Sequence, residues 1–297
     1  MSSPTLGVPP GSVSSTVSSR GRTRRPSTLT IYRWELRKLV SQKRTYLGLA
    51  LIVILPLFFV IFQNVHQRHD HGAENIFAAQ ITQSGLATPV LMLLFLSVFM
   101  LPLVAALVSG DVVANEDGNG TLKTILTRSV DRGQVFAAKA ITAMTYAAIA
   151  VFLSSTVATV AGIASWGFHS VRSFSGTIVS PGEALALVYA ADAIYLIPLL
   201  AVVSFGLLLS TVTRNSAAAV VGTIGVVILL YIVSGIPGLE GARPYLLTRQ
   251  FQNWQGLLRT PIDWGPIWHS LWLCALYAVP SLIAAYLVFL RRDVAGG

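Results

Sequence analysis

Six long apolar stretches constrain the fold more than any other feature of this sequence. A helix needs about 20 apolar residues to cross the hydrocarbon core of a bilayer, and each stretch approaches or exceeds that length. Charged residues make up only 11% of the 297 residues, against about 25% in a typical soluble domain. We therefore expect an all-α integral membrane protein with six transmembrane helices. The predicted spans are residues 46–63, 88–109, 140–164, 185–210, 216–236 and 267–290.

The distribution of basic residues predicts the orientation of these spans. With the N-terminus inside, 16 of the 21 Lys and Arg residues lie in cytoplasmic segments and five in outer loops. Cytoplasmic loops of membrane proteins carry the excess of Lys and Arg, so we expect both termini in the cytoplasm. The net charge of +9 then reflects topology and contact with anionic membrane lipid, and we expect no nucleic-acid partner.

The N-terminal part divides into a tail and a helix. Residues 1–28 are rich in Ser, Thr, Pro and Arg and show no hydrophobic period, which predicts a disordered cytoplasmic tail. Residues 29–45 combine basic and apolar side chains with a Trp, which is typical of an amphipathic helix lying in the membrane interface. The six-span domain follows over 46–292, and residues 293–297 form a cytoplasmic tail. The residues assigned to the interfacial helix are Trp34, Arg37, Lys38 and Leu39, and one side can hold Ile31, Trp34, Leu39 and Val40.

The loop between the second and third spans is the part most informative about function. Two glycines, Gly118 and Gly120, interrupt the helix, and Thr121 can cap a new one. Apolar side chains then recur with helical spacing on one face, at Leu122, Ile125 and Leu126. This pattern predicts a short amphipathic helix between the two spans, with the third span beginning near Lys139. Because nothing in this chain covers its apolar face, we expect a cytoplasmic partner there.

The order of residues around this loop resembles that of a known family. An acidic residue is followed by a Gly-Thr pair, a short Leu-rich helix, an Arg and a Lys that opens the third span. This order, the basic segment Trp34–Leu39 and the six spans together resemble an ABC-2 type permease, the membrane subunit of an ATP-binding-cassette exporter. The resemblance covers about residues 30–292. The matching loop residues are Glu116, Gly120, Thr121, Leu122 to Leu126, Arg132 and Lys139.

The resemblance implies partners and a role for the loop. In such permeases the short helix is a coupling helix that sits in a groove of a cytoplasmic ABC ATPase subunit. It also implies a second permease copy or a related permease, an efflux function and the inner (plasma) membrane of a prokaryote. The alternative is an ordinary cytoplasmic hairpin whose helix lies on lipid. The residues implied in coupling are Glu116, Gly120, Thr121, Leu122, Ile125, Leu126, Arg128 and Arg132.

The sequence argues against ATP hydrolysis by this chain. A phosphate-binding loop requires Gly immediately before its Lys, but Leu122 precedes Lys123. We therefore expect no cofactor in this chain, with ATP and Mg²⁺ bound by the partner subunit. A membrane-embedded enzyme is disfavoured because the spans hold one Asp, one His and one Cys, far apart in sequence.

Asp192 supports a different function. It is the one acidic residue within a predicted membrane core, where ionisable groups are costly and usually face a bundle interior or a wet cavity. Asp192 could line a translocation path, or it could be a structural residue near the outer end of its span. The first reading would fit an ion-gradient-driven secondary transporter or channel, although that class predicts several such acids or an inverted repeat.

Two further segments carry candidate sites on the outer side. His66, His69 and His71 have a spacing that could hold a metal, but a solvated loop is the favoured interpretation. Residues 236–266 combine four prolines with aromatic side chains, which indicates a re-entrant or interfacial structure. Trp254 and Trp264 are candidates for an outer gate there, with an aromatic interface anchor as the alternative.

Overall fold

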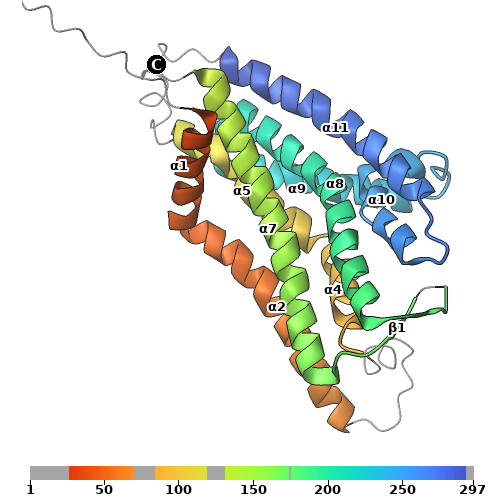
Figure 1. The fold of residues 1–297 in the computed structure, drawn as a ribbon. Helices are drawn as coiled ribbons and strands as arrows, with labels where there is room; N and C mark the ends of the chain where they lie inside the picture. Colours follow the sequence, from red (N-terminus) through yellow and green to blue (C-terminus); the bar gives the residue numbers. More distant parts are fainter. Residues whose placement is uncertain (1–26, 70–83, 119–130, 174, 292–297) are drawn as a thin grey trace, which may run out of the picture.

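A computed structural model describes residues 27–69, 84–118, 131–173 and 175–291 and shows a bundle of long helices (Figure 1). Its short elements are a two-stranded antiparallel hairpin, in which Val171 pairs with Val179, and three helices of three to six residues. The long helices are α1 (Thr28–Ser41), α2 (Lys43–His69), α4 (Ala87–Leu96), α5 (Met100–Gly118), α7 (Arg132–Trp166), α8 (Pro181–Thr213), α9 (Ser216–Gly235) and α11 (Gly265–Leu290). The short elements are β1 (Val171–Arg172), β2 (Ile178–Val179), η1 (Arg243–Tyr245), α10 (Leu247–Gln250) and η2 (Asn253–Leu258).

The long helices define a multi-pass membrane protein. Within the described ranges, five helices are long and apolar enough to cross a bilayer: α2, α7, α8, α9 and α11. A sixth span results if α4 and α5, which meet at 59°, are taken as one broken span. The predicted helical membrane fold is therefore confirmed, and its six spans are matched when the broken pair is counted as one.

The second span differs from the prediction because it is broken. Its expected range, residues 88–109, contains a turn between Leu96 and Met100. Pro102 follows the turn and has no N–H to donate to the carbonyl oxygen of Val98, four residues earlier. Proline alone does not break a helix in this chain, since Pro56, Pro198 and Pro280 lie inside continuous helices. The Tyr195 hydroxyl of α8 donates a hydrogen bond of 2.9 Å to the carbonyl oxygen of Ser97 in the turn. The break is thus fixed to α8.

The third span also begins earlier than expected. The helix was predicted to start near Lys139, but α7 starts at Arg132. Its N-cap is Asp131, whose carboxylate accepts a hydrogen bond of 2.9 Å from the backbone N–H of Gly133. This cap satisfies a donor that the first helical turn leaves free. As a result, Lys139 lies two turns inside α7, where it is fully buried.

The predicted N-terminal helix is present as α1, but a different side of it faces the bundle. Ser27 caps it, and the chain bends at Gln42 before α2 begins. The buried residues are Ile31, Glu35 and Leu39, which follow one another at four-residue spacing. Trp34 and Val40 are more than half exposed. The prediction that these two share a side with Leu39 was therefore wrong, because the acidic Glu35 occupies the buried face.

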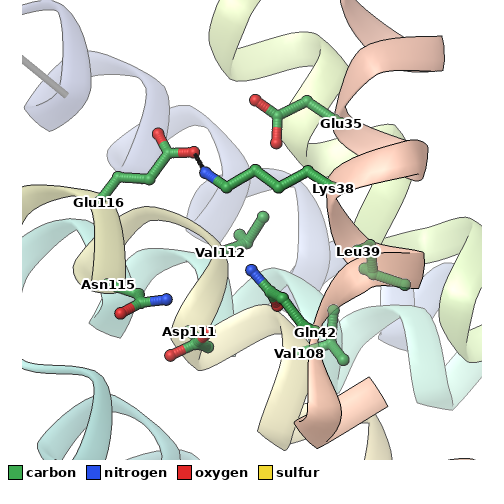
Figure 2. Close-up of a pocket in the computed structure, with 9 residues that line it drawn as sticks. All are labelled: Glu35, Lys38, Leu39, Gln42, Val108, Asp111, Val112, Asn115 and Glu116. Carbon is green, nitrogen blue, oxygen red and sulfur yellow. Dashed lines mark hydrogen bonds and ion pairs between the residues drawn. The ribbon is translucent and has the colours of Figure 1, made fainter. Parts of the chain in front are cut away.

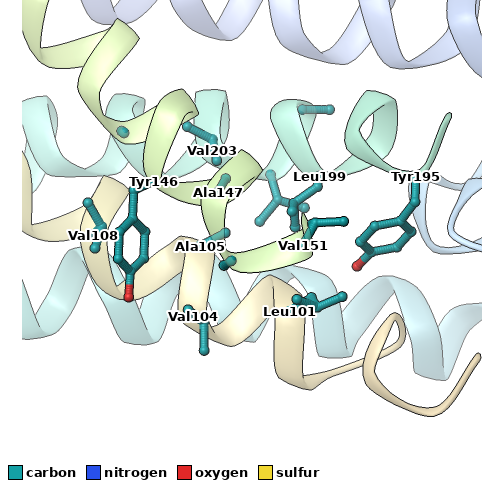
Figure 3. Close-up of a cluster of buried hydrophobic side chains, with 14 of the residues drawn as sticks. Leu101, Val104, Ala105, Val108, Tyr146, Ala147, Val151, Tyr195, Leu199 and Val203 are labelled. Atoms are coloured by element: carbon teal, nitrogen blue, oxygen red, sulfur yellow. The ribbon is translucent and has the colours of Figure 1, made fainter. Parts of the chain in front are cut away.

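The core lies where α5, α7 and α8 meet (Figure 3). The central helix is α8. Within its most apolar stretch of 18 residues, 56% is buried inside the bundle, whereas the corresponding share of α9 is 17%. Two glycines bring the helices close together. A Cβ on Gly206 would lie 2.1 Å from the Ser109 hydroxyl oxygen, and one on Gly110 would lie 2.9 Å from the backbone nitrogen of Val220. The core residues labelled in Figure 3 are Leu101, Val104, Ala105, Val108, Tyr146, Ala147, Val151, Tyr195, Leu199 and Val203.

The segment before the last helix folds against α8 and α11 as short helical turns. Phe251 packs on Tyr195 with ring centroids 5.9 Å apart, and Trp254 is fully buried. Trp264, the N-cap of α11, is half exposed. The two tryptophans predicted to form a gate therefore lie in different environments, and only Trp254 is part of the packed interior.

Candidate functional site

A cluster of four charged residues joins α1, α5 and α7 at one end of the bundle, and Figure 2 shows three of them, Glu35, Lys38 and Glu116. Glu35 and Lys38 come from α1, Glu116 from α5 and Lys139 from α7. The Lys139 ammonium lies 2.9 Å from a carboxylate oxygen of Glu35 and 2.6 Å from one of Glu116. Lys38 also pairs with Glu116. We call these residues the charged cluster.

The charged cluster is largely buried, and its positive and negative charges are equal in number. Lys139 is fully buried, and Glu35 and Glu116 are each 3% exposed, whereas the Lys38 side chain is 32% exposed. Lys139 also donates a hydrogen bond of 3.3 Å to the carbonyl oxygen of Val112. Two cations therefore face two anions, which is the condition under which charges are tolerated in an interior. The cluster fastens α1 to the bundle by charge as well as by its apolar contacts.

The space beside the charged cluster is too small for a ligand. The cleft between α1 and α5 has a volume of about 20 Å³, which is the room that one water molecule needs. Its walls include Glu35, Lys38 and Glu116, which are already paired with one another or with Lys139. Among the described residues, the cluster therefore serves to join helices, with room for about one water molecule beside it.

Two further ion pairs hold the end of α5. Asp111 pairs with Arg44 of α2 and accepts a hydrogen bond from Ser216 at the start of α9. Asp117 lies 3.7 Å from Arg214 in the turn between α8 and α9. In the second pair the Arg214 side chain is 65% exposed and that of Asp117 is 22% exposed, and pairs that reach water contribute little stability. The last turns of α5 are therefore tied to α1, α2, α7 and the α8–α9 turn.

The start of α7 is also fixed to α11. Arg132 donates a hydrogen bond of 3.1 Å to the carbonyl oxygen of Leu290. The Phe136 ring lies 5.6 Å from the rings of both Tyr286 and Phe289, measured between centroids. The two helices that flank residues 119–130 are thus anchored at their facing ends.

The structure brings together only some of the residues singled out from sequence. Lys38 and Glu116 are in the charged cluster, and Leu39 is buried beside it; Arg132 contacts α11 instead. Trp34 and Arg37 are exposed. The coupling-helix residues Gly120, Thr121, Leu122, Ile125, Leu126 and Arg128 lie outside the described residues, as do His71 and the side chains of His66 and His69. Among the described residues, no group of three or more His, Cys, Asp or Glu could hold a metal.

Asp192 forms a separate polar site inside the bundle. Its side chain is fully buried, and one carboxylate oxygen accepts a hydrogen bond of 2.8 Å from the Ser155 hydroxyl of α7. The other oxygen has no hydrogen-bond partner within the described part of the chain, and neither has the hydroxyl of Thr159, one helical turn from Ser155. Since α8 begins at Pro181, Asp192 lies about three turns from that end, a turn deeper than the sequence predicts.

Glu35, Arg44 and Asp111 were missed by sequence reasoning. A signal existed for Glu35, because it is the one acid on an otherwise basic helix and lies four residues before Leu39. Lys139 was recognised as the start of a span and as a match to the permease pattern, but not as a member of an ion-pair cluster. None of these residues reveals its partner from sequence, since each partner is far away along the chain.

These features define the chain as a helical multi-pass membrane protein. A family model described as a protein of unknown function (DUF2705) matches residues 50–295, and the chain therefore belongs to that family. A comparison with curated proteins finds no match.

Proposed function

We propose that this chain is the permease subunit of an ABC exporter, coupled to ATP hydrolysis on a separate cytoplasmic subunit. The observation that carries the proposal is the charged cluster, which joins α5 and α7 to α1. These two helices flank residues 119–130, the segment whose pattern predicts a coupling helix. A force applied to that segment would reach both helices directly.

Burial of the charged cluster favours this role. The Lys139 ammonium cannot leave Glu35 and Glu116 without leaving charges unpaired in the interior, which costs about 3–5 kcal/mol. The ends of α1, α5 and α7 would therefore move together. Because α8 packs against α5, α7 and α11, such a movement would reach the centre of the bundle. With the N-terminus inside, as the positive-inside rule predicts, this end of the bundle faces the ATPase.

The first test is purification of the chain from its native membrane in mild detergent. We expect a stoichiometric partner that contains a phosphate-binding loop, together with ATP hydrolysis that vanadate inhibits. A folded chain that purifies alone and lacks ATPase activity would contradict the proposal.

Replacing apolar residues of the predicted coupling helix with charged ones should uncouple ATP hydrolysis on the partner subunit from transport through this chain. In the Leu122→Asp/Ile125→Asp variant, two carboxylates would face the apolar groove of the partner, where unpaired charge is strongly disfavoured. We expect membrane insertion to be normal and ATP-driven transport to fall to background. The matched control is Ile236→Asp/Leu239→Asp, which changes two exposed apolar residues elsewhere and should transport normally. Full transport by the first variant would rule out this helix as the coupling element.

Asp192 favours a second candidate function, transport coupled to proton movement. A fully buried carboxyl with one unpartnered oxygen among the described residues is the kind of intramembrane acid that proton relays in transporters use. Asp192→Asn should then remove any pH dependence of transport that Asp192 causes, because an amide does not titrate. Glu240→Gln, at an exposed acid, is the control. An unchanged pH profile in Asp192→Asn would make Asp192 a structural residue.

A further inference from the structure

A larger cavity lies under the hairpin, at the end of the bundle opposite α1 (Figure 1). It has a volume of about 350 Å³ and lies between the hairpin, the first turns of α4 and α8, and residues 257–262. Pockets for small molecules usually measure about 300–1,000 Å³. We call this space the hairpin cavity.

Hydrogen bonds hold the cover of the hairpin cavity in place. The Ser173 hydroxyl donates to the carbonyl oxygen of Leu258 at 2.6 Å, and the backbone N–H of Thr260 donates to the Ser175 hydroxyl at 2.8 Å. The Thr177 hydroxyl also donates to that of Thr260 at 3.1 Å. The hairpin and residues 257–262 therefore form one connected wall above the helix ends.

The interior of the hairpin cavity is apolar. Thirteen of its 20 lining residues are apolar, and they come from all four segments around it. An aliphatic chain would pack well against such walls, because each methylene group buried there raises the binding affinity roughly fourfold. The volume is at the lower end of the ligand range, which suits one aliphatic chain. The walls include Leu86, Val90, Leu187, Val188, Leu257 and Ile262.

Charged side chains line the cavity as well. Arg172 follows Val171 in β1, Arg259 lies in the cover, and Glu183 lies in the first turn of α8. Arg259 is 3.5 Å from Asp263 in an exposed pair, whereas no ion pair involving Arg172 is present in the described ranges. Arginine suits phosphate, since its planar group can donate two parallel hydrogen bonds. A phosphate beside Arg172 would also place the aliphatic part of the same molecule next to the apolar walls.

We propose that the hairpin cavity binds a single-chain amphiphile that carries a phosphate group. The apolar walls hold the chain, and Arg172, with Arg259 beside the cavity, holds the phosphate. This assignment rests on the cavity alone. It stands whether or not the chain works with an ATPase.

The test is photolabelling of the full chain in lipid nanodiscs. The probe is a lysophosphatidylglycerol with a diazirine in its acyl chain, and the reference probe has the same chain on a neutral sugar headgroup. We expect the phosphate probe to label residues 84–91, 184–188 and 257–262. Leu187→Trp should reduce this labelling at least about tenfold, because the indole occupies the space that several methylenes would fill.

Matched variants separate the cavity from the lipid-facing surface. Leu229→Trp introduces the same side chain at an exposed position of α9 and should leave labelling unchanged. Arg172→Gln should weaken labelling by the phosphate probe about tenfold without affecting the neutral probe, whereas Arg249→Gln should affect neither. Labelling spread over exposed faces and insensitive to Leu187→Trp would overturn the site. Equal labelling by both probes, unaffected by Arg172→Gln, would overturn the phosphate assignment.

Discussion

Lys139→Met should lower the free energy of unfolding by about 3–5 kcal/mol. Methionine has nearly the same length as lysine but leaves Glu35 without its cation and Glu116 with Lys38 alone. Both acids are buried, so water cannot replace the lost ammonium group. We expect a variant that inserts into the membrane but loses its folded, monodisperse population in detergent. Thermal unfolding followed by size-exclusion chromatography measures the loss.

A second substitution distinguishes loss of charge balance from loss of packing. In Lys139→Met/Glu35→Leu, one cation and one anion are removed together, and the Lys38–Glu116 pair remains. We expect the double variant to recover at least half of the lost stability. Arg214→Met is the surface control, because its pair with Asp117 is largely exposed and should contribute less than about 1 kcal/mol. A double variant as unstable as Lys139→Met would show that charge balance is not the cause.

Gly162→Leu should prevent α4 and α7 from packing as they do. A Cβ on Gly162 would lie 2.3 Å from the carbonyl oxygen of Gly85 and 2.6 Å from the Thr88 hydroxyl oxygen. The nearest atom belongs to the backbone, so relief requires the helices to separate and cannot come from a side-chain rotation. Overpacking costs about 1–3 kcal/mol for smaller insertions, and we expect at least that for leucine. Gly162→Ala should show a smaller effect of the same sign.

Gly182→Ala is the control for this prediction. Gly182 lies in the first turn of α8, and a Cβ there would meet nothing within 4 Å. Alanine is favoured over glycine in helices by up to about 1 kcal/mol, so this variant should be as stable as the parent or slightly more stable. If Gly162→Leu unfolds at the same temperature as Gly182→Ala, the close contact of α4 and α7 does not contribute to stability.

The helical membrane fold could be predicted because it depends on local properties. Apolar length alone located the spans, and the basic flank with its Trp located α1. The break in the second span could not be located from Pro102 alone, since Pro56, Pro198 and Pro280 lie inside unbroken helices. What composition could not show is where a helix ends. The polar turns of α5 and α7, which include Glu116 and Lys139, continue past the apolar stretches because tertiary ion pairs stabilise them.

The charged cluster could not be predicted because its members come from three distant parts of the chain. Lys139 lies 104 positions from Glu35, and only the packing of α1 against α7 brings them together. Asp192 was recognised from sequence because an acid in an apolar stretch is unusual, but its contact with Ser155 also depends on packing. Sequence therefore identified unusual residues, whereas their pairing required the structure.

The unequal lengths of α8 and α9 determine which parts of the molecule leave the hydrocarbon layer. With 20 residues, α9 is about 30 Å long, which equals the thickness of that layer. With 33 residues, α8 is about 20 Å longer, and the short turn at Arg214 places the whole excess at the hairpin end. Asp192 then lies near the level where α9 ends. The hairpin stands beyond that level, so an amphiphile would approach its cavity from beyond the end of α9.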